Sequence, residues 1–288
     1  MIRRLVVLIL VVAVAYTGWN YFGPGPARPN AYVADASEFR CWPPYPAGPA
    51  PPIRLGTGRV PKDFVPVAAI TCDPYFGDVA ADSTAEYVER RWEGDFGPAL
   101  RLLNDRSEPE SWPLKVCTVA YSAAMIDEMW LLDEQGRAVR PGYPVDECGM
   151  SKIGGLAEIK KLETVSTVAH RVQLDPALIE QVSGCTSLFE PPAEGSTTLD
   201  SDFVAYGFCR FSLEASGPRF DGSFGADIDV AGLPVAPDCS FTATKVAVGS
   251  TYLDGDRTVL IEFDGCRRVI VDGYAALGAS EEILQSFP

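Results

Sequence analysis

The segment WLLDEQGRAVRPGYPVDECG, residues 130–149, combines four carboxylates and one thiol within twenty positions. Such residues could do chemistry, because a thiol beside a base is a nucleophile and paired carboxylates serve as general acid and base. The immediate neighbours of Cys148 are Asp146 and Glu147, whose negative charges disfavour a thiolate. The segment therefore predicts a tight hairpin followed by a disulfide, and not a catalytic cluster.

The hairpin prediction rests on Asp133-Glu134-Gln135-Gly136, which lies between two apolar runs. The aspartate can accept hydrogen bonds from the turn, and the glycine can take a positive φ. A related turn occurs at Asp254-Gly255, a dipeptide typical of two-residue hairpins. A catalytic role would require Glu134 to recur, whereas the second turn has Gly255 at that place.

The cysteines predict disulfides. Eight of them, at positions 41, 72, 117, 148, 185, 209, 239 and 266, form an even set without a C-x-x-C pair. A zinc cluster is a poor alternative because His170 is the single histidine of the sequence. In an exported chain the pattern predicts four structural disulfides. The pairs that we favour are Cys117–Cys148, Cys239–Cys266, Cys41–Cys72 and Cys185–Cys209.

Residues 117–148 and 239–266 follow a common order. Each begins at a cysteine, passes through an apolar stretch and an acidic turn, and ends at a cysteine beside a glycine. This order predicts a diverged internal duplication with four cysteines in each half. If the disulfides respect the halves, three connectivities remain open in each half.

The first 22 residues predict a signal-anchor transmembrane helix. Arg3 and Arg4 precede an uncharged run from Leu5 to Phe22, which as a helix would be about 27 Å long, enough for a bilayer core. Ala13-Val14-Ala15 resembles a cleavage site, so secretion after signal cleavage is the alternative. In both cases the bulk of the chain is expected to be extracytoplasmic, held at the cell membrane as a single-pass protein in the first case.

The charge of the chain restricts its partners. The formal net charge is −15. Such a surface repels nucleic-acid phosphates and anionic lipid headgroups, and it attracts cations and basic partners. The charge therefore argues against a nucleic-acid partner and favours a basic protein or a cell-wall component, whereas the membrane is an expected partner through the predicted N-terminal helix.

Composition divides the remaining chain into a Pro/Gly-rich stalk at 23–63, a first disulfide-stapled unit at 64–173 and a second at 174–288. The predicted class is α+β, with antiparallel hairpins and a few short helices. Strands are predicted at 66–72, 115–123, 163–172, 203–213, 240–248, 257–263 and 267–274. Helices are predicted at 97–103 and 153–162, after the N-cap Asp175, and after the N-cap Ser280.

Closely spaced aspartates suggest one metal site. Asp221, Asp227 and Asp229 could hold calcium through oxygen ligands, with Asp200 and Asp202 nearby in the sequence. Their spacing does not match the calcium-loop motif of EF-hands, and solvated turns are the alternative explanation. No other cofactor is predicted, and the sequence nominates no catalytic or cofactor-binding residue.

An enzyme would have to use carboxylates. A pair of them could hydrolyse glycosides outside a cell wall. With 39 acidic residues some pair is suitably spaced by chance, so none is nominated. The sequence favours a binding or structural module over an enzyme and leaves the question open.

The apolar leader, the proline-rich stalk and the pattern C-x30-C-G, with PVDECG before a short predicted helix, resemble exported or membrane-anchored proteins of uncharacterised function common in actinobacteria. The resemblance covers mainly residues 66–170 and implies no activity or site residues. We therefore expect a membrane-tethered, extracytoplasmic binding or structural module of the cell envelope. The alternatives are a cell-envelope hydrolase with a carboxylate pair and a calcium-stabilised adhesion-type module.

Overall fold

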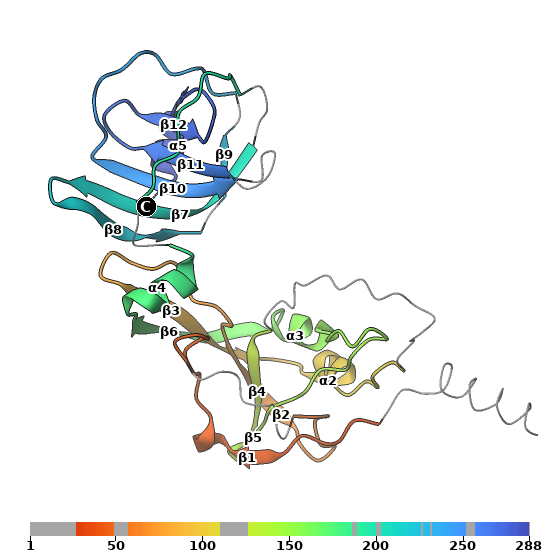
Figure 1. Ribbon diagram of the computed structural model, residues 1–288. Helices are drawn as coiled ribbons and strands as arrows, with labels where there is room; N and C mark the ends of the chain where they lie inside the picture. The colour runs from red at the N-terminus through yellow and green to blue at the C-terminus, as the bar shows by residue number, and fades with distance from the viewer. Residues whose placement is uncertain are drawn as a thin grey trace, which may run out of the picture. The chain divides into compact units, whose positions relative to one another are not determined.

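The structure is a computed structural model that describes residues 27–48, 57–109, 126–185, 189–199, 203–225, 227–230, 232–251 and 257–287. It consists mostly of antiparallel β-sheet with a few short helices, as the sequence predicts (Figure 1). The described residues form two compact units. Those within 1–42, 49–74 and 88–169 make the first unit, and those within 43–48, 75–87 and 170–288 make the second.

A six-stranded sheet carries the first unit, in the order β1-β5-β4-β2-β3-β6. The strands are β1 (Val33–Asp35), β2 (Pro66–Cys72), β3 (Thr84–Glu93), β4 (Glu128–Asp133), β5 (Arg137–Val139) and β6 (Glu163–Gln173). The helical elements are the short η1 (Ala36–Glu38), α2 (Gly97–Leu103) and α3 (Gly154–Ile159). Strand β2 and helix α2 have the bounds that the sequence predicts, whereas α3 is shorter than the predicted 153–162.

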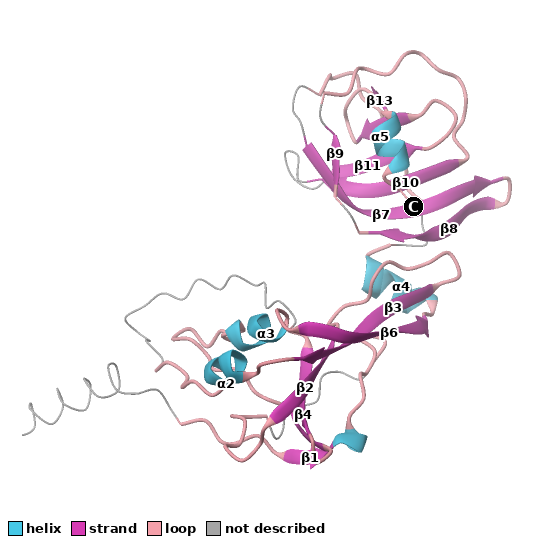
Figure 2. Cartoon of the chain, turned by 180° about the vertical axis from the view of Figure 1, so that it is seen from behind, coloured by secondary structure: helices cyan, strands magenta, loops and turns pink. Residues whose placement is uncertain are grey.

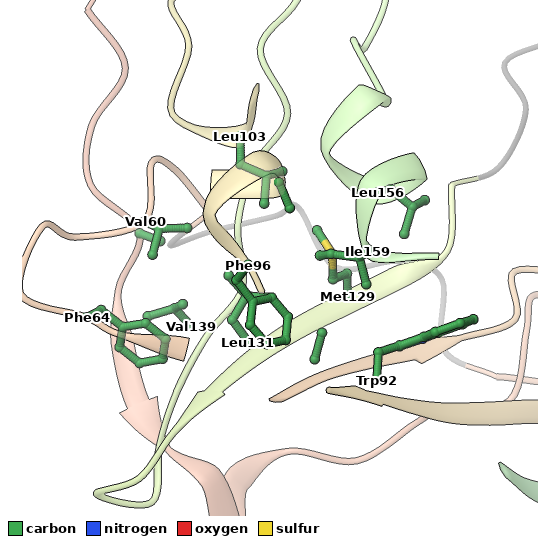
Figure 3. Close-up of a cluster of buried hydrophobic side chains, with 13 residues drawn as sticks. Val60, Phe64, Trp92, Phe96, Leu103, Met129, Leu131, Val139, Leu156 and Ile159 are labelled. Atoms are coloured by element: carbon green, nitrogen blue, oxygen red, sulfur yellow. The ribbon is translucent and has the colours of Figure 1, made fainter. Parts of the chain in front are cut away.

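Helices α2 and α3 cover one face of this sheet (Figure 3). Leu103 and Ile159 from the helices and Leu131 from β4 are fully buried in the resulting core. Gly155 lets the two helices approach closely, because a Cβ there would lie 2.5 Å from Leu103 Cγ. Most apolar positions of α2, α3 and β4 are thus buried within one unit, whereas Leu102 of α2 is exposed.

Most of the described N-terminal segment belongs to the first unit, whereas the stalk predicted for residues 23–63 was expected to be pinned onto the body at one point, near Cys41. In its described parts, Ala31 and Val60 are buried, and bridges join Asn30 to Arg59 and Gly58 to Pro141. Prolines keep such a segment extended, but they do not prevent it from pairing with an existing sheet edge. Strand β1 lies beside β5 for the same reason.

A seven-stranded sheet carries the second unit (Figure 2), in the order β13-β12-β11-β10-β7-β8, with β9 paired to β7. The strands are β7 (Phe203–Glu214), β8 (Gly217–Phe224), β9 (Ile228–Val230), β10 (Lys245–Thr251), β11 (Arg257–Glu262), β12 (Arg268–Val271) and β13 (Leu277–Gly278). The helices are α4 (Pro176–Ser183) and α5 (Glu281–Gln285), whose N-caps are the predicted Asp175 and Ser280. The predicted strand at 240–248 is wrong at its start, because β10 begins at Lys245.

Apolar side chains cover both faces of this sheet. Phe208 and Val259 belong to a cluster that also holds Ile283 of α5. Phe211 and Leu260 belong to a separate cluster. Strict alternation along β11 and β12 produces this division, since successive side chains point to opposite faces.

The turn between β2 and β3 belongs to the second unit, although the predicted first unit, 64–173, includes it. Val79 and Ala85 are buried with Leu174 in a small apolar cluster. Ser223 N–H donates to Val79 O at 2.8 Å, and Val79 N–H donates to Ser223 Oγ at 2.7 Å. A division of the chain into contiguous segments cannot place this turn in the second unit. Val79 of the turn bonds to Ser223, more than a hundred positions away.

The two sheets share an order of four strands. In the first, β5-β4-β2-β3 are neighbours, and in the second, β11-β10-β7-β8 are. In each set the strand that comes first in the chain lies between the second and the third. The hairpins β4–β5 and β10–β11 coincide with the two segments whose sequence order is similar.

The described cysteines are all bonded. Disulfides join Cys41 to Cys72, Cys185 to Cys209 and Cys239 to Cys266, the pairs that the sequence analysis favours. Cys148 is also disulfide-bonded. Its predicted partner, Cys117, lies outside the described residues, as does the predicted strand at 115–123.

The predicted signal anchor, residues 1–22, also lies outside the described residues. Within the part of the chain that the structure describes, no helix is long and apolar enough to cross a bilayer.

Asp133 shows how the first hairpin is held. Its buried carboxylate accepts hydrogen bonds from Gln135 N–H at 3.0 Å and Arg137 N–H at 2.9 Å, and it pairs with Arg137 Nε at 2.7 Å. Burial alone would raise the pKa of Asp133, but the hydrogen bonds and charge of Arg137 outweigh burial and lower it. The turn prediction for residues 133–136 is confirmed, and no catalytic role is needed to explain this acid.

Asp133→Asn is expected to lower the free energy of unfolding by about 1–3 kcal/mol at pH 7, since it leaves buried turn donors poorly paired. Tryptophan fluorescence during urea unfolding measures this, because all five tryptophans precede residue 170. The lowered pKa means that the carboxylate stabilises the fold fully above about pH 4 and ceases to do so as the pH falls through the folded-state value.

Glu134→Gln, an exposed change in the same turn, is the control and should shift stability by less than about 0.5 kcal/mol. Equal effects of the two substitutions would show that Asp133 does not hold the hairpin. So would a difference between wild type and Asp133→Asn that does not shrink in acid.

Candidate ligand site in the second unit

The structure does not gather the three aspartates suggested as calcium ligands. Asp221 lies on β8, where it accepts a hydrogen bond from Ser212 Oγ and pairs with Arg219 Nη1 at 2.5 Å. Asp227 and Asp229 lie apart from it in the chain, and Asp229, on β9 opposite Val204, is exposed. Among the described residues no group of three or more metal-ligating side chains is present. Asp200 and Asp202 lie outside those residues.

The buried carboxylates are structural. Asp133 holds the first hairpin, as described above. Glu262 of β11 receives two hydrogen bonds from the Arg268 side chain, at 2.8 and 3.0 Å. The Glu262 hydrogen bond and charge raise the pKa of Arg268, which keeps the guanidinium charged. Because each of these acids is paired, neither is available as a general acid.

A cavity of about 340 Å³ lies in the second unit, over β7 and β10. Its size is within the range of sites for small ligands. The lining combines charged and aromatic side chains: Arg210, Phe211, Asp221, Lys245, Val246, Phe263, Leu284 and Phe287. All of these residues come from one compact unit, so the cavity is built within it.

A β-bulge places the carboxylate of the cavity. Arg210 pairs with Gly222 and Phe211 with Phe220, so Asp221 is the extra residue on β8. A bulged residue departs from the usual alternation of side chains, and here it turns towards Ser212. Gly222 has a φ of +119°, and a Cβ there would lie 2.6 Å from Val79 O and 3.0 Å from Arg210 Nη2. The glycine therefore makes room first for the backbone at Val79 and also for the arginine.

Basic side chains outnumber acidic ones in the described lining of the cavity. Arg210 and Lys245 line it, and Asp221 is the single acid of the described lining. That acid is already neutralised by Arg219, whose own pKa is raised by its hydrogen bond to Glu214 and by the charge of Asp221. Neither cation is isolated. Burial would raise the pKa of Asp264, but hydrogen bonds from Thr244 and Lys245 and the charge of Lys245 outweigh burial and lower it, and Arg210 also has partners.

Phe287, two residues from α5, forms the aromatic wall. Its ring contacts those of Phe208, Phe224 and Phe263, with centroids 5.0, 4.8 and 4.9 Å away. Such contacts stabilise beyond the area that they bury. The C-terminal segment is thus held on the sheet by aromatic packing, and it closes one side of the cavity.

A second hollow, of about 300 Å³, is less specific. It lies beside the Cys185–Cys209 disulfide and is lined in part by Gly207 and Gly249. Among its described lining residues Glu190 is the single charged one. With one charge, at an exposed position, it presents little to orient a ligand.

Sequence patterns do not nominate the cavity. Arg210 and Lys245 stand in ordinary strand alternation, 35 positions apart, and nothing local indicates that their strands are neighbours. The one available signal is Asp221 beside Gly222, which the sequence analysis assigns to a calcium site. The glycine there does mark a special position, a bulge at a charged cavity.

Comparison of the chain with protein-family models, with curated proteins and with solved structures finds no match. The function is therefore argued from the geometry of the described residues.

Phe287→Ala is expected to destabilise the second unit by about 2–3 kcal/mol, because it removes a partly buried ring and its three aromatic contacts. Hydrogen exchange of β7 and β11 amides measures the effect. Phe241→Ala is the matched control, since Phe241 is 74% exposed and should tolerate the same truncation. Equal protection in both variants would contradict the role given to Phe287.

Proposed function

We propose that the chain is an extracytoplasmic binding module of the cell envelope, tethered to the membrane by residues 1–22, that binds a small amphipathic anion in its second unit. The observation that carries the ligand class is the cavity itself, where Arg210 and Lys245 lie beside the aromatic rings of Phe263 and Phe287.

The compartment is supported by the cysteines. Four pairs of thiols are predicted, and every described cysteine is bonded. Disulfides of this number persist in oxidising compartments and are rare in the cytosol of most cells. The apolar run from Leu5 to Phe22, preceded by two arginines, supports insertion with the bulk of the chain outside.

The charge distribution supports an anionic ligand. An acidic surface repels anions at long range, but a local pair of cations within a partly enclosed cavity can still bind one. Arg210 offers a planar fork of donors, which suits a carboxylate, sulfonate or phosphate group. The rings of Phe263 and Phe287 provide apolar area for the rest of the ligand.

The rest of the acidic surface suits a basic partner protein or a cell-wall component. The two units are proposed to derive from one duplicated ancestor, which the shared strand order supports. In that case the ligand cavity is an acquisition of the second unit, since the described part of the first unit packs α2 and α3 on its sheet instead.

The probe for the site is anilinonaphthalene sulfonate, an aromatic anion whose fluorescence rises on binding. Wild type should bind it more tightly than phenylnaphthylamine, which has the aromatic body without the sulfonate. Arg210→Gln is expected to weaken sulfonate binding about tenfold, by loss of a charge-assisted contact. Lys245→Gln is expected to weaken it a few-fold, because Lys245 is exposed.

Lys62→Gln is the matched control, because it removes the same charge from an exposed position of the first unit. It should leave the affinity within twofold of wild type. Urea unfolding of each variant excludes probe binding to loosened protein. Equal affinities for the charged and neutral probes, or an unchanged affinity in Arg210→Gln, would reject an anion site in this cavity.

A further inference from the structure

Among the described residues, strand β6 is an unprotected sheet edge. It pairs with β3 and is the last strand of its sheet, with no described strand on its other side (Figures 1 and 2). Side chains on both of its faces are exposed from residue 163 to 169. Val165 and Val168 are 41% and 46% exposed. The edge therefore presents backbone donors and acceptors to solvent along a long strand.

In the part of the chain that the structure describes, the usual protection of a sheet edge is missing at β6. Natural edges are blunted by lysine, proline, a bulge or inward-pointing charge. The six residues TVSTVA, 164–169, contain no charge and no proline, and four of them are β-branched threonine or valine. Such a segment favours further strand pairing. Glu163 and Arg171 stand at its two ends with opposite charges.

The hydrogen bonds of β3 and β6 decide which backbone groups point outward. Leu174 N–H donates to Ser83 O, and Asp73 N–H donates to Val88 O on the opposite side of β3. Antiparallel strands alternate between residues that bond to one neighbour and residues that bond to the other. The even-numbered residues of β6 therefore face β3. The odd-numbered ones, from Glu163 to Arg171, offer their N–H and C=O groups outward.

We infer that the outward edge of β6 pairs with β6 of a second copy of this chain, antiparallel and about a two-fold axis at Thr167. In this register Thr167 is opposite Thr167 of the second copy, Val165 is opposite Ala169, and Glu163 is opposite Arg171. These positions are all outward-bonding residues, so each opposed pair exchanges two backbone hydrogen bonds. A two-fold axis makes the interface self-complementary.

Charge selects this register over its neighbours. Glu163 forms no ion pair within the described chain, and the axis at Thr167 places it opposite an arginine at both ends of the interface. Arg171 already contacts Glu86 Oε1 through Nε at 3.0 Å and Nη2 at 2.8 Å. The second carboxylate would lie on the other side of the same guanidinium. A register shifted by two residues would bring Glu163 opposite Ala169 or Gln173 and lose the pairing.

The inference is independent of the ligand cavity, which lies on other strands. The first test of the dimer is a disulfide cross-link between the two copies. Thr167→Cys places two thiols about 5.5 Å apart between Cα atoms, within the range for a disulfide. Mild oxidation of the full chain, with its native disulfides formed, should give a linked dimer. Mass spectrometry should then find two copies of the peptide that contains position 167, joined by the new disulfide.

Ala169→Cys is the matched control, because position 169 lies about 13 Å from its own copy in this register and should not link. A mixture of Val165→Cys and Ala169→Cys chains should link to each other. Linking at position 169 that is as fast as at position 167 would overturn the register.

The second test measures the reversible association of two copies. Sedimentation of the full wild-type chain at micromolar concentration should show a dimer. Thr167→Lys, which brings two like charges together on the axis, should raise the dimer dissociation constant at least about tenfold. Ala169→Lys, with the same charge on the same face, should raise it less. A wild-type chain that stays monomeric at tens of micromolar, or a dimer insensitive to Thr167→Lys, would overturn the proposal.

Discussion

Both units depend on a covalent bond between an upstream segment and the strand that their sheets are built around. Cys72 ends β2 and Cys209 lies within β7, and each is bonded to a cysteine 31 or 24 positions earlier. Strands β2 and β7 each have a strand on both sides. Closing loops of this length stabilises a fold by about 3.5 kcal/mol in the chain-entropy model. In the first unit this bond adds to the burial of Ala31 and Val60 and to the pairing of β1 with β5 in holding the segment before β2.

A third disulfide closes the hairpin of the second unit. Cys239 and Cys266 flank β10 and β11, so the hairpin and the segment that leads into it are joined. In the first unit Cys148 follows the corresponding hairpin β4–β5 and is also bonded. A bonded cysteine thus follows the corresponding hairpin in each sheet, and the pairing of Cys148 with Cys117 stays a prediction. The bond also removes the one thiol, Cys148, that stood within an apparently reactive segment.

Local signals in the sequence predicted those elements that local physics determines. The run PVAAITC is buried on both faces, and it became the interior strand β2. Asp175 with Pro176, and Ser280 before two glutamates, predicted the starts of α4 and α5 through capping. The stalk prediction did not include the packing of Ala31 and Val60, because proline content describes the local backbone and not its partners. The exchange of the β2–β3 turn into the second unit depends on contacts such as Val79 with Ser223, which no local pattern contains.

The candidate site could not be predicted from local sequence patterns for the same reason. Arg210 and Lys245 become neighbours through the pairing of β7 with β10, and Asp221 joins them through a bulge. Phe287 closes the cavity from the end of the chain. The edge strand β6 is the opposite case, since its alternation and its end charges are visible in the sequence. That β6 is an edge strand follows only from the strand order, which places no described strand on its other side.

Oxidised cysteines within each unit are the central claim, and a disulfide map tests it most directly. The full chain would be alkylated without reduction, digested and analysed by mass spectrometry. We predict no alkylated thiol and linked peptides for Cys41 with Cys72, Cys185 with Cys209 and Cys239 with Cys266, together with a bonded Cys148. A free thiol, or a bridge that joins a cysteine before residue 170 to one after it, would contradict the account.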